Sequence, residues 1–277
     1  MDLLDIISSL AIATSAPMSA PKIDKASAFY GDLVEWFETK QCRSESAIAQ
    51  DGLLRASRMG GILSHLPRLR VSPRILPSLL AATTPQSGEQ ATFDVGHAVH
   101  WWWQNHYLGQ WGRLWGEWEC CECHGSFVGL RPSACSCCCN DEFRFRESAL
   151  SDPDLRYRGH PDGMIVEPGD AKPTALLEIK TASTSSWDGL REPMHEHRIQ
   201  VHAYMRRTTP PVREVYYVYI DKGKQSIWRK ESNGGFKATT PPRWKVFWEA
   251  FDDAFWSGVE RDLREFWAIY DASGAKK

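Results

Sequence analysis

Alternation of apolar and polar residues predicts β-strands in the second half of the chain. Residues 176–180 alternate with a period of two, so that Glu178 and Lys180 project from the same face of a short apolar strand. The β-branched and aromatic run at 215–220 predicts another strand, which we expect to lie beside the first. A carboxylate and an ammonium group therefore share one face of a sheet.

Helical periodicity predicts further elements on either side of these strands. Residues 27–39 and 46–59 repeat apolar positions at helical spacing, and 82–89 is expected to be a polar linker before a helix that carries His100. Near the C-terminus, 244–270 places apolar residues close to a rhythm of about 3.6 residues, which predicts one long packing helix. Strands among helices indicate an α/β protein.

The segment before the Glu178 strand supplies a second carboxylate. Asp162 lies in a turn-rich segment at 159–163, and a hairpin loop at 167–170 is expected to join its strand to that of Glu178. Two converging carboxylates can hold Mg²⁺ or Mn²⁺, which favour hard oxygen ligands. With Lys180, they form the minimal apparatus for metal-dependent phosphodiester cleavage, although Glu-x-Lys alone also occurs as a solvated charge pair.

Two outer motifs extend this pattern in both directions. His100 closes a G-x-x-x-H motif that begins at Gly96, and a Q-x-x-x-Y motif places Gln200 and Tyr204 on one helical face. The four motifs, in the order G-x-x-x-H, G-x-x-D, E-x-K and Q-x-x-x-Y, resemble the RecB-like branch of the PD-(D/E)xK nuclease superfamily. This branch includes the nuclease domains of helicase-nucleases, CRISPR-associated adaptation nucleases and many phage exonucleases. The resemblance runs from about residue 55 to residue 219.

The resemblance implies a role for each of these residues. It implies a catalytic Mg²⁺ or Mn²⁺ ion whose ligands are His100, Asp162, Glu178 and the main-chain carbonyl of Ile179. Lys180 would position or deprotonate the attacking water, while Gln200 and Tyr204 would hold the substrate strand or the lysine. His197 lies three residues before Gln200 on the same helical side and is a further candidate for contacting nucleic acid.

The resemblance also implies a fold and an activity. The fold would be a restriction-endonuclease-like α/β core with a mixed central sheet flanked by helices. The activity would be that of a metal-dependent deoxyribonuclease, specifically an exonuclease acting on free DNA ends in phage-type recombination, repair or genome processing. Recombination or replication proteins would then be its partners. A structure-selective endonuclease with the same centre and a catalytically idle DNA-end-binding or assembly protein are the alternatives. The intact Asp162, Glu178 and Lys180 argue against the idle protein.

Seven of the eight cysteines lie within twenty positions of one another. Two C-x-x-C pairs separated by 11 residues predict a small zinc-ribbon-like insert at 118–142, with four structural ligands: Cys120, Cys123, Cys135 and Cys138. The other cysteines and His124 leave the register open. An iron-sulfur cluster is the main alternative to zinc, but its ligands in the CRISPR-associated relatives flank the nuclease core instead of lying together. Disulfides are disfavoured in a reducing compartment.

Composition limits how nucleic acid could be bound. A net charge of −2 excludes a generally basic nucleic-acid binder, so any affinity must come from local patches. Residues 52–88 contain five arginines and no acidic residue. Within them, Arg55, Ser57 and Arg58 resemble the segment at which RecB-like nucleases begin their fold. We expect a phosphate-contacting rim there, with a solvated loop and helix face as the alternative.

The 277 residues divide into an N-terminal helical region at 1–51 and a nuclease domain at 52–277 that can bury a substantial core. The tryptophan-rich run at 101–118 is expected to pack this core or to brace the cysteine insert. Apolar runs fall short of the roughly 18 residues needed to cross a bilayer, and a basic signal segment is lacking. We therefore expect no membrane association and a cytoplasmic protein of a bacterial or phage-infected host cell.

Overall fold

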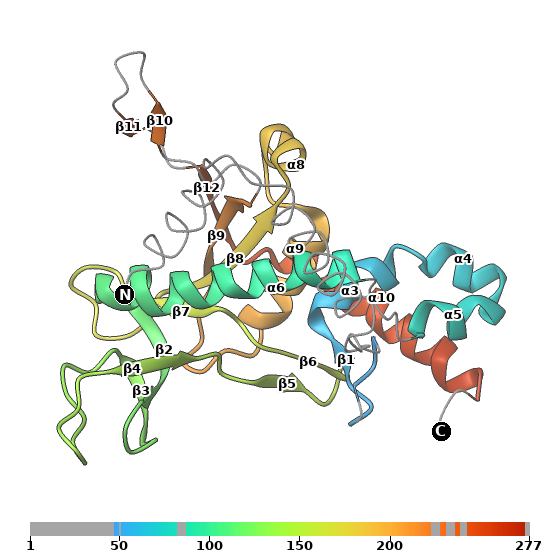
Figure 1. Ribbon diagram of the computed structural model, residues 1–277. Helices are drawn as coiled ribbons and strands as arrows, with labels where there is room; N and C mark the ends of the chain where they lie inside the picture. Colours follow the sequence, from blue (N-terminus) through green and yellow to red (C-terminus); the bar gives the residue numbers. More distant parts are fainter. Residues whose placement is uncertain are drawn as a thin grey trace, which may run out of the picture. The chain divides into compact units, whose positions relative to one another are not determined.

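The computed structural model describes residues 47–49, 51–81, 87–222, 228–230, 236–238 and 243–274 (Figure 1). It divides into two units, and all of these residues except 87–90 belong to the larger unit, which comprises Ser44–Thr83 and Ala91–Lys277. The helix predicted at 27–39 lies outside the described residues, as does most of the N-terminal region 1–51.

A mixed sheet forms the centre of the larger unit. Its strands run in the order β12-β9-β8-β7-β2-β3, and β4 also pairs with β2. The strands are β2 (Leu114–Cys120), β3 (Ser126–Leu130), β4 (Phe143–Arg146), β7 (Gly163–Ile165), β8 (Ala175–Ala182), β9 (Glu214–Asp221) and β12 (Trp244–Ala250). Only β8 and β9 pair in parallel within this sheet, and the other pairs are antiparallel. The predicted strands at 176–180 and 215–220 are therefore confirmed as neighbours.

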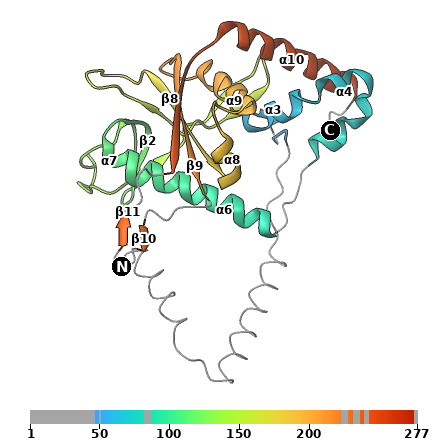
Figure 2. The ribbon, with the colours of Figure 1, turned by 90° about the horizontal axis from the view of Figure 1, so that it is seen from above.

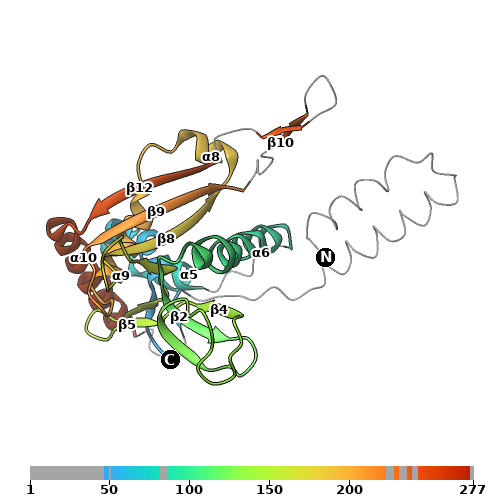
Figure 3. The ribbon, with the colours of Figure 1, turned by 90° about the vertical axis from the view of Figure 1, so that its left-hand side faces the viewer.

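Helices cover both faces of this sheet (Figures 2 and 3). The helix α6 (Ser87–Trp102) lies along one face, where Leu177 and Ile179 of β8 form an apolar cluster with Val99. On the opposite face, Leu176 packs in a second cluster with α9 (His195–Met205), α10 (Asp253–Ala272) and α3 (Ala56–Leu63). Because successive strand residues point to opposite faces, β8 is apolar toward both helical layers and carries its charges at alternate positions.

Smaller elements complete the described part of the chain. A three-stranded sheet has the order β1-β6-β5, with strands β1 (Leu54–Arg55), β6 (Tyr157–Gly159) and β5 (Leu150–Asp152). The remaining elements are α4 (Leu66–Val71), the 3₁₀ turn η1 (Pro73–Ile75), α5 (Leu76–Leu80), the π-helical segment η2 (Trp103–Leu108), α7 (Gly109–Trp111), α8 (Thr184–Gly189), and the hairpin of β10 (Trp228–Lys230) and β11 (Phe236–Ala238).

The helix predicted at 46–59 is wrong for most of its length, because only the last residues are helical, in α3. Gly52 reverses the chain with a left-handed φ of 78°, and Asp51 accepts a hydrogen bond from the Leu53 amide. β1 then pairs with β6. The linker predicted at 82–89 is also wrong in part, since α6 already begins at Ser87, while 82–86 lie outside the described residues.

The single helix predicted at 244–270 is also wrong, because its first seven residues form β12. Side chains at 244, 246 and 248 are exposed while those between them are half-buried, which is the alternation of an edge strand. Asp252 then starts α10 by accepting hydrogen bonds from the amides of Ala254 and Phe255. The aromatic residues of β12 therefore lie on both faces of a strand, with Trp244 and Trp248 exposed and Phe247 half-buried, and those after Asp252 follow a helical period.

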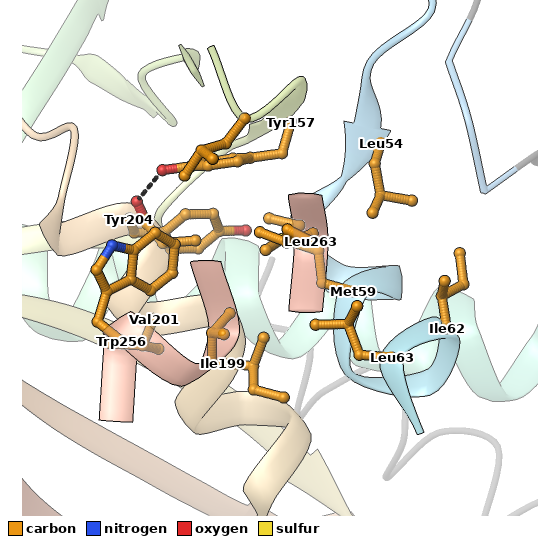
Figure 4. Packing of buried hydrophobic residues seen from close by; sticks show 14 of the residues in the cluster. Leu54, Met59, Ile62, Leu63, Tyr157, Ile199, Val201, Tyr204, Trp256 and Leu263 are labelled. Carbon is orange, nitrogen blue, oxygen red and sulfur yellow. Dashed lines mark hydrogen bonds between the residues drawn. The ribbon is translucent and has the colours of Figure 1, made fainter. Parts of the chain in front are cut away.

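Packing against α9 fixes the strand that precedes the predicted site (Figure 4). Tyr157 of β6 is fully buried, and its hydroxyl donates to the Ala203 carbonyl of α9 over 2.9 Å.

The expectation that the tryptophan run packs the core holds for Trp118 but not for Trp101, Trp102 and Trp111, which are 47%, 37% and 52% exposed. Across the described ranges we find no helix with the length and apolar character to span a bilayer.

Candidate active site

Asp162 connects α6 to the central strand. It directly precedes β7, and its side chain is 8% exposed. Its Oδ2 accepts a hydrogen bond of 2.6 Å from the Ile179 amide, and its Oδ1 lies 3.2 Å from Nδ1 of His100. Burial alone would raise the pKa of Asp162, but the charges of His100 and Lys180 outweigh it and lower the pKa. The structure therefore brings His100, Asp162 and the Glu178 strand together.

Glu178 is a buried carboxylate that is only partly satisfied. Its side chain is 2% exposed, and Oε1 lies 2.6 Å from Nζ of Lys180. Its Oε2 has no hydrogen-bonding partner among the described residues. Burial raises the pKa of Glu178 to about 7, although Lys180 acts in the opposite direction. A buried acceptor without a partner is costly, which suggests that something else completes this carboxylate.

A hydrogen-bonded chain holds Lys180 from the α9 side. Nζ of Lys180 donates to Oε1 of Gln200 over 3.0 Å, and Nε2 of Gln200 donates to the Tyr204 hydroxyl over 2.7 Å. Burial disfavours the ammonium form of Lys180, but Glu178 and Asp162 overcome this and raise its pKa. Gln200 and Tyr204 therefore lie where they can hold the lysine, which is one of the two roles that the sequence motifs imply.

Steric contact with Tyr204 explains why a glycine, Gly159, begins the G-x-x-D motif. A Cβ atom on Gly159 would lie 2.9 Å from the Tyr204 hydroxyl oxygen and closer still to its ring carbon Cε1. Because Tyr204 is 2% exposed, it has little room to move away. Two motifs that are separate in sequence thus meet in one tight contact, which fixes where Asp162 lies relative to Lys180.

Glu147 joins the site without having been predicted. One ligand atom each from His100, Glu147 and Asp162 lie within 4.8 Å of one another. Nε2 of Gln104 donates both to Oε1 of Glu147 over 3.0 Å and to the Asp162 carbonyl over 2.9 Å, so it holds the two residues together. Burial and the neighbouring Asp162 charge raise the pKa of Glu147 to about 7. In sequence, Glu147 is a single acidic residue after a short alternating strand, a signal shared by many surface glutamates.

This donor set suits a divalent cation with a preference for oxygen. Glu147 and Asp162 converge with His100, while Glu178 lies outside that group but is close enough for the charges of Asp162 and His100 to act on it. The surroundings of Glu147 and Glu178 favour their protonated forms, and Oε2 of Glu178 lacks a partner among the described residues. A bound cation would favour the ionised carboxylates and would give Oε2 of Glu178 a partner. Carboxylates with one imidazole are ligands that Mg²⁺ and Mn²⁺ accept. For the predicted ligand Ile179, the structure shows its amide bound to Asp162.

The four predicted cysteine ligands also lie together. The Sγ atoms of Cys120, Cys123, Cys135 and Cys138 are all within 4.8 Å of one another. The Cys120–Cys138 and Cys123–Cys135 pairs are each separated by 3.5 Å, far beyond a disulfide bond length of about 2.05 Å. Amides of the two turns donate to sulfur and lower the pKa of Cys120 to about 6, and they also lower the pKa of Cys135. The insert is therefore compatible with a zinc ribbon.

The predicted nucleic-acid contacts have different surroundings. His197 is partly buried, and its Nδ1 lies 2.7 Å from the Tyr219 hydroxyl; burial, with Lys180 nearby, lowers its pKa to about 3. Arg55 is half-buried on β1, whereas Ser57 and Arg58 are exposed on α3. Burial and the charges of Arg158 and Arg55 lower the pKa of His160.

No protein-family model and no curated protein matches the sequence. Among solved structures, the chain is similar to the alkaline exonuclease LHK-Exo from Laribacter hongkongensis, with 16% identity and a TM-score of 0.44 over 87% of this chain and 93% of that one. The complex of LHK-Exo with dAMP gives 17% identity and a TM-score of 0.43 over the same shares. A protein designated SSO0001 gives 11% identity and a TM-score of 0.37 over 86% and 88%. These likenesses are distant, so a functional assignment has to rest on the side chains of the site.

Proposed function

We propose that the chain is a divalent-metal-dependent deoxyribonuclease that hydrolyses phosphodiester bonds, and that it acts as an exonuclease at free DNA ends. The observation that carries the proposal is the buried Glu178 carboxylate. Its Oε1 pairs with Lys180, and its Oε2 has no hydrogen-bonding partner among the described residues. Asp162, His100 and Glu147 offer ligand atoms within 4.8 Å of one another, and the charges of Asp162 and His100 act on Glu178. Preference for DNA ends, and a role in recombination or genome processing, come from the resemblance of the four motifs.

The residues divide the chemistry between them. His100, Asp162, Glu147 and Glu178 would hold Mg²⁺ or Mn²⁺, which supplies water activation and neutralisation of phosphate charge when bound. Lys180, whose ammonium form Glu178 and Asp162 favour, contributes positive charge to a phosphate in the same space. Gln200 fixes the position of that ammonium group, and Tyr204 fixes Gln200.

Cleavage of end-labelled linear DNA and covalently closed circular DNA tests this function. We expect loss of linear DNA in Mg²⁺ or Mn²⁺, no reaction in EDTA, and an intact closed circle.

Asp162→Asn, Glu178→Gln and Lys180→Ala should each lower the rate by about 10² to 10⁴ while the protein stays folded. Asp154→Asn is the matched control, since its carboxylate is 79% exposed. Cutting of the closed circle would favour the endonuclease alternative, and end binding without cleavage the idle one. Full activity in EDTA would falsify the metal assignment.

We also propose that the cysteine insert binds one structural zinc ion. A tetrahedral ion with four Zn–S bonds of about 2.3 Å requires sulfur atoms roughly 3.8 Å apart, close to the two 3.5 Å separations and within the 4.8 Å limit for the whole set. An iron-sulfur cluster needs room between its thiolates for several atoms. A closed shell of four thiolates has no open position for water, so the insert would support folding and perform no cleavage.

A further inference from the structure

An open cleft of about 640 Å³ lies beside the proposed metal ligands. His100 and Glu147 line it, together with Trp101, Phe145, Arg146 and His160. Its volume falls in the range of roughly 300 to 1,000 Å³ that is typical of small-molecule sites. Hydrolysis needs only the groups around the phosphate, and the lining, which also includes Glu117, offers further aromatic and basic groups.

Trp101 forms one wall and directly follows the proposed ligand His100. Its side chain is 47% exposed although it lines the cleft, and its ring meets His106 edge-on with 5.2 Å between the ring centroids. An indole that lines a cleft and is 47% exposed can accept a planar partner by stacking. Nucleobases stack on such surfaces whatever their sequence, because every base has a π-face.

Arg146 is an arginine of the same cleft lining. It ends β4, immediately before Glu147, and its side chain is 52% exposed. Glu119, whose side chain is 11% exposed, pairs with the guanidinium group and also lies 3.0 Å from Nδ1 of His124 in the cysteine insert. Arg146 is therefore held in position while about half of its side chain remains exposed. Such an arginine is suited to a phosphate.

We propose that this cleft is a nucleotide subsite for single-stranded nucleic acid, in which a base stacks on Trp101 while Arg146 contacts a backbone phosphate. The proposal rests on the proposed nuclease function and specifies its substrate. A base can stack on Trp101 only after it has left the duplex, so the strand that reaches Asp162 and Glu178 is unpaired next to the cleavage position. The cleft thus selects a single-stranded or frayed end.

Binding of a short fluorescein-labelled single-stranded oligonucleotide, measured by anisotropy with Ca²⁺ in place of Mg²⁺, tests the subsite. Trp101→Ala should weaken binding about 5- to 140-fold, and Trp101→Phe should recover most of the loss. Trp111→Ala is the matched control, because Trp111 is 52% exposed and lies outside the cleft lining. An oligonucleotide of abasic positions with the same backbone charge should bind the parent and Trp101→Ala equally.

Salt dependence separates the two contacts. Arg146→Gln should reduce the slope of log affinity against log salt by about 0.7, the amount for one phosphate contact on a single strand. Trp101→Ala should leave this slope unchanged. The subsite is overturned if Trp101→Ala binds like the parent, or if its deficit persists on the abasic strand. Failure of the parent to cleave in Mn²⁺, with Trp101-dependent binding retained, would refute hydrolysis and leave the subsite standing.

Discussion

Replacing Gly159 by alanine tests whether the contact between two motifs controls the site. The added Cβ would lie 2.9 Å from the Tyr204 hydroxyl oxygen and nearer to the ring, while Tyr204 is 2% exposed and sits on the rigid helix α9. Overpacking of this kind typically costs about 1 to 3 kcal/mol. Relief of the clash moves Tyr204, and with it the Gln200 side chain that fixes Lys180. Misplacement by an ångström can cost on the order of 10² in rate.

Thermal denaturation and steady-state kinetics measure the two consequences. At roughly 2 to 4 °C for each kcal/mol, Gly159→Ala should lower Tm by about 2 to 12 °C, with a fall in kcat larger than any change in KM. Gly258→Ala is the matched control in α10, where a Cβ meets nothing within 4 Å. There the same substitution should stabilise the protein by roughly 0.5 to 1 kcal/mol. A Gly159→Ala protein with the parent's Tm and kcat would refute the reasoning.

Three further predictions concern other parts of the structure. Glu147→Gln should raise the Mn²⁺ concentration needed for half-maximal cleavage on the order of 10-fold, whereas an unchanged metal titration would remove Glu147 from the ligand set. Cys123→Ser should lose bound zinc and thermal stability, while the exposed Cys121→Ser keeps both, as metal analysis and denaturation can establish. Burial would raise the pKa of Asp152, but its hydrogen bonds, first of all the one from Arg207, lower the pKa below the ordinary 3.8. Ionised Asp152 therefore stabilises the folded protein above about pH 3.8, and this stabilisation is lost as the pH falls further. The stability gap between the parent and Asp152→Asn should therefore be full near neutral pH and shrink as pH falls below about 3.8.

The sequence predicted the central strand and the α9 side chains well because their signals are local. Glu178 and Lys180 lie two residues apart on an apolar strand, so the pleat alone places them on one face. Gln200 and Tyr204 lie four apart on a helix, which brings them into hydrogen-bonding reach of each other. Neither inference needs knowledge of which elements pack together. The assignment of roles to these residues stays a prediction.

Boundaries were harder to predict where one composition satisfies two periods. The aromatic residues at 244, 247, 248 and 251 fit a helical rhythm, yet 244–250 pairs with β9 along its whole length. Pairing with a neighbouring strand is a tertiary event that overrides local preference. The useful local signal was Asp252, which caps α10 and thereby excludes the preceding residues from the helix. Similarly, the Asp51–Gly52 turn contradicts a continuous helix before α3.

Glu147 could not be predicted because its position depends on how two strands share a third. β4 and β7 both pair antiparallel with β2. β4 pairs with residues 117–120 of β2 and β7 with residues 114–115, so the end of β4 and the start of β7 are neighbours along β2. Glu147 follows the one and Asp162 precedes the other, which brings their carboxylates together although fifteen positions separate them. The cysteine insert lies between β2 and β4 and joins their ends, since Cys120 is paired in register with Phe143. The structural zinc that we propose for the insert would therefore help to hold in register the strand that precedes Glu147, which gives such an insert a structural reason to lie inside this α/β core.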